Sequence, residues 1–287
     1  MERAMFLPQG LSLAPLAPGV DQILLAGDGF SARIALLGGQ LIDYRSDGKP
    51  PLLYLSPQTA YQPGKAIRGG VPVCWPWFGP HPSDAGQPAH GVARQQIWTL
   101  RDAGCDGQVF HVKLDGPRHG DLAAELDFRI GPDGAAIALT TVNHGDAAQT
   151  VSAALHSYFA VSDIDSVELL GLEGAPAHDK VADARAALPA GPFRFDGEVD
   201  LVVYSDRAAT LRDAGWRRDI AIQPEGSASA VVWNPAPAKA QRLADLPDED
   251  WRRFVCVETA NAGDDARALA PGEHHRLACH LHFSCHG

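Results

Sequence analysis

A stretch rich in proline and tryptophan carries the side chains best suited to hold a polar, ringed, anionic ligand. It runs Arg68-Gly-Gly-Val-Pro-Val-Cys-Trp-Pro-Trp-Phe-Gly-Pro80, followed by Pro88-Ala-His-Gly-Val-Ala-Arg94. Its prolines fix φ and remove backbone donors, so the first segment is neither a helix nor a central strand. Aromatic faces cover apolar C–H surfaces, and the guanidinium groups of Arg68 and Arg94 suit phosphate or carboxylate. A structural loop stiffened by prolines is the alternative. The aromatic residues predicted to line the pocket are Trp75, Trp77 and Phe78 from this stretch, and Trp233.

Two residues further along the chain are of types that transfer protons. His156 ends the strand-like run that begins at Thr150, and an imidazole titrates near neutral pH. Glu258 follows the apolar run Phe254-Val-Cys-Val257, where burial would raise the pKa of its carboxyl toward that of a general base. The alternatives are a structural histidine and a solvated glutamate at the end of a strand. Spacing alone does not pair the two residues.

These motifs together resemble those of the hexose-6-phosphate mutarotases (glucose-6-phosphate 1-epimerases) of the aldose 1-epimerase superfamily. The resemblance extends from about Asp21 to Phe283. Besides the proline-rich stretch it includes, in the same order, HSYFAVSDI (156–164), VVWNPAPAKAQRLAD (231–245), FVCVETANA (254–262) and LAPGE (269–273). Several long, ordered motifs are more specific than any one short motif.

The resemblance implies a chemical mechanism and a role for each residue. A histidine and a glutamate of this family work on opposite sides of the anomeric carbon. Glu258 would take the proton of the C1 hydroxyl and His156 would protonate the ring oxygen. The ring then opens to the aldehyde, C1 rotates, and the ring closes on its other face. No cofactor is expected, because proton transfer and orientation do all the work.

The resemblance also implies which residues bind the substrate. Arg68 and Arg94 correspond to arginines that hold the 6-phosphate. His90 and Asp200 correspond to residues that bind sugar hydroxyls, and Trp233 would shape the cleft. The expected function is interconversion of the α and β anomers of an aldohexose 6-phosphate, with glucose 6-phosphate as the expected substrate.

Two other functions stay open. The first is an aldose 1-epimerase acting on unphosphorylated sugar, which would give Arg68 and Arg94 nothing to hold. The second is a non-catalytic carbohydrate-binding β-sandwich, which would lack the acid or the base. Fold alone does not decide between them, because sandwiches host many activities.

Histidines and cysteines gather near the C-terminus and raise the question of a metal site. His280 and His282 would share one face of a strand, close to Cys279 and Cys285. No carboxylate or Cys-x-x-Cys pair completes a ligand set in the sequence, so no metal is predicted. The chain also has no Walker-type loop and no Rossmann fingerprint, which argues against nucleotide chemistry.

Composition limits the partners of this 287-residue chain. The net charge of −11 argues against binding to nucleic acid or to an acidic membrane, and it requires local arginines to attract an anionic substrate. Five scattered cysteines suggest reduced thiols, and no stretch is long and apolar enough to span a membrane. We expect a cytoplasmic protein, with a monomer weakly favoured.

The pattern along the chain predicts an all-β protein, a large antiparallel β-sandwich of the galactose mutarotase type with few short helices. Short alternating runs are separated by turns, as in 123–130 and 135–142, which Gly131-Pro-Asp-Gly134 joins as a hairpin. Residues 247–254 are expected to form a short helix. Residues 1–19 are interpreted as a lead-in, and residues 20–287 as one catalytic domain.

Overall fold

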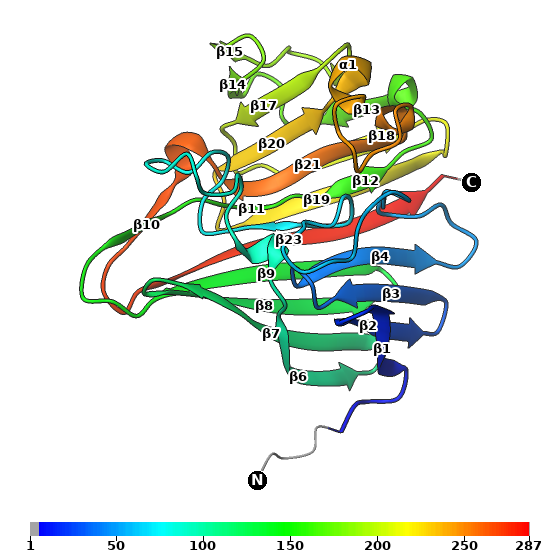
Figure 1. Cartoon of the computed structure of the whole chain (residues 1–287). Coiled ribbons are helices and arrows are strands. Elements are labelled where there is room, and N and C mark those ends of the chain that lie inside the picture. Colours follow the sequence, from blue (N-terminus) through cyan, green and yellow to red (C-terminus); the bar gives the residue numbers. More distant parts are fainter. Residues whose placement is uncertain (1–5, 287) are drawn as a thin grey trace.

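The computed structural model describes residues 6–286, and antiparallel strands make up most of it (Figure 1). The largest sheet has nine strands, in the order β16 (Phe193–Arg194), β13 (Val167–Leu170), β18 (Ala209–Asp213), β19 (Arg218–Glu225), β23 (His274–Cys285), β9 (Gly134–Asn143), β8 (Leu122–Gly131), β7 (Val109–His119) and β6 (Thr99–Asp106). The second has eight, in the order β15 (Ala184–Ala187), β14 (Pro176–Asp179), β17 (Val199–Val203), β20 (Ser229–Asn234), β21 (Phe254–Asn261), β11 (Ala153–Leu155) and β5 (Val73–Cys74), with β12 (Tyr158–Ala160) also paired to β21.

Two smaller sheets and a few short helices complete the fold. The smaller sheets are β1 (Leu11–Ala17), β2 (Val20–Gly27), β3 (Phe30–Ala35) and β4 (Gln40–Ser46), and the pair β10 (Gln149–Val151) and β22 (Arg267–Leu269). The helices are α1 (Ala236–Ala240) and the 3₁₀ turns η1 (Ala93–Gln95), η2 (Ile164–Ser166), η3 (Asp250–Arg253) and η4 (Gly263–Asp265). Across residues 6–286, no helix has the length and apolarity needed to cross a membrane. The predicted all-β fold is confirmed, and the expected short helix at 247–254 is the 3₁₀ turn η3.

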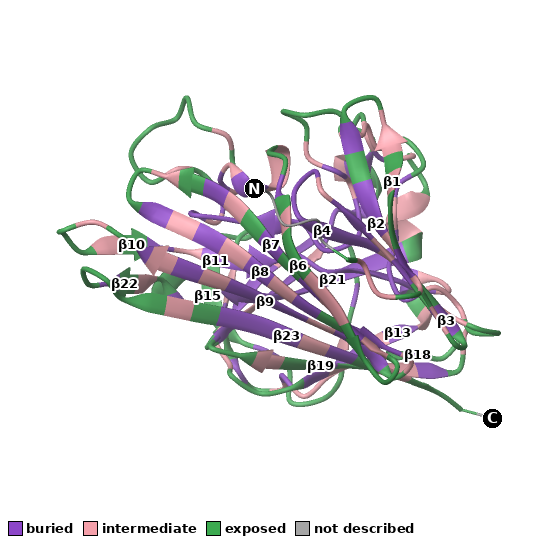
Figure 2. Cartoon of the chain, turned by 90° about the horizontal axis from the view of Figure 1, so that it is seen from below, coloured by how far each residue is buried: buried purple, intermediate pink, exposed green. Residues whose placement is uncertain are grey.

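The two large sheets bury their facing sides in a shared core, as Val257 of β21 and Leu277 of β23 illustrate. Figure 2 shows buried and less buried residues alternating along β8. In β8, Leu126, Phe128 and Ile130 are buried while the residues between them are not, as the period of two predicts. The predicted hairpin is confirmed, since Gly131 pairs with Gly134. Gly134 is required there, because a Cβ would lie 1.9 Å from the carbonyl oxygen of Leu281.

The N-terminal segment is more than a lead-in. Residues 11–17, which fall within the predicted lead-in of residues 1–19, form β1 and pair with β2. Pro15 is tolerated because β1 is the edge of its sheet, where a missing N–H leaves no ladder bond unmade, and the register shifts just after it. Residues 1–5 of that segment lie outside the described part of the chain.

Strand β21 carries the candidate base, and its alternation sets the direction of each side chain. Val255 and Val257 belong to the main core between the sheets, while Phe254, Cys256 and Glu258 lie on the opposite face. The sequence pattern suggested that the strand ends at Glu258, but it continues to Asn261. Glu258 is therefore held inside a central strand with only 1% of its surface exposed.

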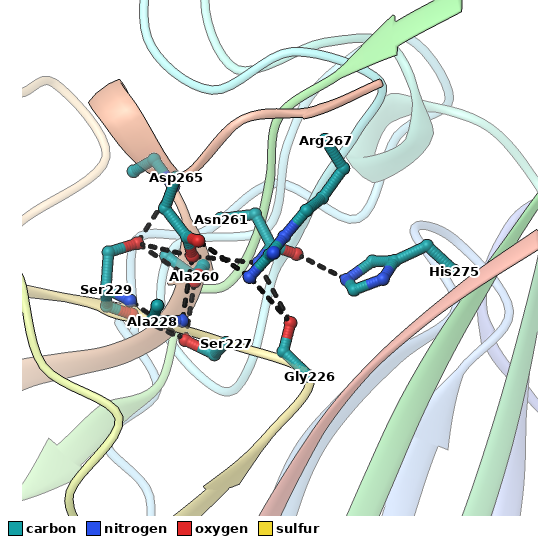
Figure 3. A network of polar contacts seen from close by, with 10 residues as sticks. Gly226, Ser227, Ala228, Ser229, Ala260, Asn261, Asp265, Arg267 and His275 are labelled. Carbon is teal, nitrogen blue, oxygen red and sulfur yellow. Dashed lines mark hydrogen bonds and ion pairs between the residues drawn. The ribbon is translucent and has the colours of Figure 1, made fainter. Parts of the chain in front are cut away.

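A polar network fixes the far end of β21 (Figure 3). The buried carboxylate of Asp265 accepts hydrogen bonds from the backbone N–H of Ala228 and from Nδ2 of Asn261, both at 2.9 Å. It also contacts Nη2 of Arg267 at 2.6 Å. Oδ1 of Asn261 in turn lies 2.9 Å from Nε2 of His275 on β23, so the network joins the two large sheets.

Removing this carboxylate should destabilise the protein. We expect Asp265→Ala to lower the free energy of unfolding by about 3 kcal/mol, because the half-buried guanidinium of Arg267 and the buried amide of Asn261 would lose their acceptor. The matched control is Asp264→Ala, whose carboxylate is exposed and pairs with the exposed Arg185, and which should cost less than about 1 kcal/mol. Urea denaturation of both variants makes the comparison, and equal losses would contradict a structural role for Asp265.

Candidate active site

A cavity of about 210 Å³ lies on the outer face of the eight-stranded sheet. Its lining residues are Arg68, Phe78, His90, Arg94, His156, Tyr158, Lys180, Asp200, Val231, Trp233, Lys239 and Glu258. Strand register explains how distant residues meet there: Asp200 of β17 pairs with Trp233 of β20, and Val231 of β20 pairs with Glu258 of β21. Side chains of paired residues point to the same face, so these four share one side of the sheet.

His156 and Glu258 lie side by side at this cavity. His156 follows β11 and stacks on the ring of Tyr158, with centroids 4.7 Å apart and planes 11° apart. Its Nδ1 is 3.2 Å from Oε1 of Glu258, in a geometry that does not make a hydrogen bond. Nδ1 of His156 and Oε2 of Glu258 are thus buried polar atoms without a hydrogen-bond partner among residues 6–286. Such atoms are costly to leave unsatisfied, which indicates a place for a polar ligand.

The short separation corrects one part of the sequence-based expectation. A histidine and a glutamate on opposite sides of the anomeric carbon would need room for the sugar between them. At 3.2 Å no ring fits between His156 and Glu258. A sugar bound at this cavity would instead lie against both residues. The C1 hydroxyl and the ring oxygen are bonded to the same carbon, so neighbouring acid and base groups can reach both.

Burial controls the protonation of this pair. Desolvation lowers the pKa of His156 well below its ordinary value, and nearby His90, Arg94 and Arg68 lower it further. Desolvation also raises the pKa of Glu258 well above its ordinary value, with a further contribution from Asp200. Both shifts favour the neutral forms of the two side chains.

The two predicted phosphate-binding arginines differ in how free they are. Nη1 of Arg68 donates to the hydroxyl of Tyr158 at 3.0 Å, and its Nε and Nη2 contact Oδ1 of Asp245, each at 3.1 Å. Nη2 of Arg94 donates to the carbonyl of Ala89 at 2.9 Å, but its buried Nε has no hydrogen-bond partner among the described residues. Arg94 is thus the better placed of the two to bind an anion, while Arg68 already has a carboxylate partner.

Two lysines that the sequence analysis did not single out also line the cavity. Nζ of Lys180, just after β14, lies 3.9 Å from Oδ1 of Asp200, and Nζ of Lys239, on α1, lies 3.9 Å from Oδ2 of the same carboxylate. Lys239 also contacts Oε1 of Glu198 at 2.7 Å. With the two arginines, four cationic side chains meet two carboxyl groups at this cavity. The position of Lys239 inside the segment 231–245 was a signal that could have identified it; Lys180 carries no such signal.

His90 is held as a neutral hydrogen-bonding group. The backbone N–H of Gly79 donates to its Nδ1 at 3.4 Å, which places the ring proton on Nε2. Burial, then the charges of Arg94, Lys180 and Arg68, lower the pKa of His90 to about 3. Its φ of 66° is unusual for a residue other than glycine. The next residue must be glycine, because a Cβ on Gly91 would lie 1.9 Å from the carbonyl oxygen of Trp75.

Two of the four predicted aromatic residues do not line the cavity. Phe78 and Trp233 do, but Trp75 is fully buried in the core, where its Nε1 donates to Oγ1 of Thr141 at 2.9 Å. Trp77 donates to the carbonyl of Pro88 at 3.0 Å. The prediction for Trp75 and Trp77 is therefore wrong. Tyr158, which was not predicted, supplies the missing aromatic wall.

The histidines and cysteines near the C-terminus make separate contacts. Nε2 of His280 lies 3.2 Å from Oε2 of Glu225, and Nδ1 of His282 lies 3.2 Å from the carbonyl oxygen of Asp133. Within residues 6–286, no three or more His, Cys, Asp or Glu side chains form a group that could hold a metal ion. All five cysteines are free thiols.

Comparison with known proteins identifies the family of this chain. The model of the family described as aldose 1-epimerase matches residues 21–282. A protein of Escherichia coli (strain K12) named "Putative glucose-6-phosphate 1-epimerase" is 36% identical over 255 residues, which is 85% of this chain and 84% of that protein. One of Cenchrus ciliaris with the same name is 31% identical over 278 residues, 90% and 83% of the two chains. The crystal structure titled as a putative mutarotase (YeaD) from Salmonella typhimurium superposes with a TM-score of 0.89 at 30% identity, covering 98% of this chain and 96% of that one. The chain belongs to the aldose 1-epimerase family.

Proposed function

We propose that this protein interconverts the α and β anomers of an aldohexose 6-phosphate, with glucose 6-phosphate as the substrate, using His156 and Glu258 as the proton-transfer pair. The observation that carries the proposal is the cavity itself. It is lined by a histidine and a carboxyl group, each with a buried polar atom that lacks a hydrogen-bond partner in the described structure, and by four cationic side chains. This concentration of positive charge occurs in a protein whose net charge is −11. Relatives that carry the name glucose-6-phosphate 1-epimerase support the same choice.

The proton count of the pair suits the reaction. Ring opening needs one group that accepts the C1 hydroxyl proton and one that donates to the ring oxygen. Burial raises the pKa of Glu258 and lowers that of His156, so it favours the distribution with the proton on the carboxyl group. A proton moved from Glu258 to His156 would leave Glu258 as the base and His156 as the acid; the two side chains lie 3.2 Å apart and need only reorient to form the hydrogen bond for this transfer. The reverse distribution serves the reverse step, so one pair catalyses both directions without a cofactor.

The remaining lining residues would hold the substrate. Arg94, with its unpartnered Nε, and Lys239 and Lys180 form the cationic part of the cavity and would bind the phosphate, with Arg68 behind them. Nε2 of the neutral His90 would donate to a sugar hydroxyl. Asp200 would accept from another hydroxyl. We also propose that the protein is a monomer and that it is cytoplasmic. Size-exclusion chromatography tests the first statement, and cell fractionation tests the second.

The direct test is exchange spectroscopy by NMR. The anomeric protons of glucose 6-phosphate and of glucose are followed with and without the protein, at matched concentrations. We expect the protein to speed exchange between the two anomers of glucose 6-phosphate far more than between those of glucose. Equal acceleration of both sugars would favour an aldose 1-epimerase for free sugars, and no acceleration of either would favour a non-catalytic carbohydrate-binding protein.

Arg94→Ala should separate phosphosugar from free sugar. The variant loses a charged donor with a free buried Nε, and a hydrogen bond to a charged group contributes about 1.5–3 kcal/mol. We expect kcat/KM for glucose 6-phosphate to fall by about 10- to 100-fold, and any activity on glucose to change by less than about threefold. The matched control is Arg118→Ala, which removes an exposed arginine outside the cavity. Equal losses on both sugars would contradict a phosphate-binding role.

The two cavity histidines should stay neutral at a pH where a histidine in an unfolded peptide is largely protonated, since its pKa is about 6.5. Because the pKa of His90 is lowered to about 3, we expect its imidazole to remain neutral at pH 5, and we expect the midpoint of His156 to lie below the ordinary value of about 6.5. Nitrogen-15 NMR of labelled histidine follows each ring, with signals assigned from His90→Asn and His156→Asn. A midpoint at or above pH 6.5 for either ring would contradict the proposed electrostatics.

A further inference from the structure

A second cavity of about 400 Å³ lies outside the candidate active site, between β3, β4 and the turn η3. None of its lining residues lines the first cavity, within the part of the chain that the structure describes. Tyr54 separates the two spaces, because its ring stacks on Phe254 and Phe254 in turn packs on Tyr158 of the first cavity. The volume is in the range of pockets that hold small molecules.

Arginine is the dominant charged residue of the second cavity. Its lining includes Arg33, Arg45 and Arg253 against the carboxylates of Asp43 and Asp250. Nε of Arg33 lies 3.5 Å and Nε of Arg45 lies 2.9 Å from the same carboxylate, Asp43. The contacts of both arginines with Asp43 run through Nε. Guanidinium groups of this kind bind phosphate or carboxylate in a forked geometry.

The third arginine, Arg253, makes only a long contact with its nearest carboxylate. Nη1 of Arg253 is 4.0 Å from Oδ1 of Asp250, too far for a hydrogen bond, and 72% of its side chain is exposed. Oδ2 of Asp250 instead accepts a hydrogen bond from the hydroxyl of Tyr54 at 2.7 Å. Arg253 is thus free to turn toward an anion at the mouth of the cavity.

A buried positive charge lies behind the floor of this cavity. The guanidinium of Arg218 is fully buried, and its nearest carboxylate, that of Asp213, is 4.0 Å away. Its Nη atoms donate to the carbonyl groups of Pro51 and Ala160, two residues that line the cavity. The same guanidinium lies 4.7 Å from the ring centroid of Trp216, another lining residue. Its charge adds to that of the lining arginines in favouring an anion.

We propose that this second cavity binds a small phosphorylated molecule with a flat or apolar body, independently of the candidate active site. The arginines would hold the phosphate, and Tyr54, Trp216 and the apolar residues of the wall would cover the body. Because the protein carries a net charge of −11, such a concentration of arginines is not a consequence of a generally basic surface.

Phenyl phosphate is the probe, because it joins one phosphate to one flat ring. The indole N–H signal of Trp216, assigned from Trp216→Phe, reports on the second cavity in nitrogen-15 NMR titrations. We expect a saturable shift of this signal with phenyl phosphate and none with phenol. The double variant Arg33→Gln, Arg45→Gln should weaken binding by at least about tenfold, and Arg253→Gln provides a second test on an exposed side chain. Arg118→Gln, an exposed control, should change it by less than about twofold.

A further variant distinguishes the two cavities. Arg94→Gln removes a cation of the first cavity, so it should leave the response of Trp216 unchanged whether or not the proposed epimerase function is correct. The proposal is overturned if the Trp216 signal shows no saturable shift, if phenol shifts it as phenyl phosphate does, if the double variant and Arg253→Gln bind as tightly as the parent, or if Arg94→Gln abolishes the response.

Discussion

Glu258→Gln should reduce the rate of anomer interconversion of glucose 6-phosphate by about 10³-fold, the range that a positioned general acid or base contributes. The substitution keeps the size and polarity of the side chain but removes the ionisable carboxyl group. Glu258 has Oε1 3.2 Å from the imidazole of His156 and an unsatisfied Oε2 at the cavity, and among residues 6–286 no other carboxyl group lies within 4.0 Å of that imidazole. Exchange spectroscopy measures the loss directly.

The same variant should fold at least as well as the parent at pH 7. Burial raises the pKa of Glu258 in the folded state, whereas the unfolded carboxyl ionises at an ordinary pKa of about 4.3. The buried carboxyl therefore costs stability once the pH rises above the unfolded pKa, and glutamine removes that cost. A thermal midpoint equal to or above that of the parent, together with lost activity, is the expected combination. Normal activity in the variant would rule out Glu258 as a catalytic residue.

Glu125→Gln is the matched control for this variant. Its carboxylate is on the exposed face of β8 and pairs at 3.0 Å with Arg101, far from the cavity. Exposed ion pairs contribute little to stability, and this one contacts no residue of the candidate site. We expect unchanged activity. A similar loss in both variants would mean that the effect of Glu258→Gln comes from something other than the removed carboxyl group.

His156→Asn should cost about 10²- to 10⁴-fold in kcat. Asparagine is close to histidine in size and keeps a polar group, but it cannot transfer a proton. The ring of His156 stacks on Tyr158 and lies against Glu258, so its loss removes one of the two members of the proton-transfer pair. His144→Asn, at an exposed turn, is the matched control and should be fully active. An unchanged rate in His156→Asn would remove its assigned role.

The two substitutions should not add. If His156 and Glu258 act as one pair that shares a proton, either single substitution already disables the pair. The double variant should then be nearly as active as the less active of the two single variants. Losses that multiply in full would mean that the two side chains act in separate steps. The KM for glucose 6-phosphate should change little in any of these variants, since the cationic side chains remain.

The local sequence pattern was sufficient to predict the strands of the nine-stranded sheet. It was insufficient to predict which way a tryptophan such as Trp75 points. Leu126, Phe128 and Ile130 could be assigned to one face because a strand alternates with a period of two, whatever surrounds it. Trp75 has no such rule. It lies in a proline-rich segment, and its burial against Thr141 depends on β9, far along the chain.

The candidate site shows the same division. The segments containing His156, Glu258, Arg94 and Asp200 could be selected from residue types and from ordered motifs that resemble one family. The pairing of Arg68 with Asp245 could not be predicted from the sequence, because the two residues lie 177 positions apart in the chain. Lys180 reaches the cavity only because β14 pairs with β17 beside Asp200.

By itself, the amino-acid sequence determined the all-β fold, the turns between strands and the residue types capable of the chemistry, because these follow from alternation, backbone restriction and side-chain functional groups. Only the tertiary structure decided that His156 and Glu258 lie next to each other rather than across a sugar, that two lysines join the arginines, and that a second arginine-lined cavity exists. Distances between residues far apart in the chain depend on strand register and loop packing, which no local pattern encodes.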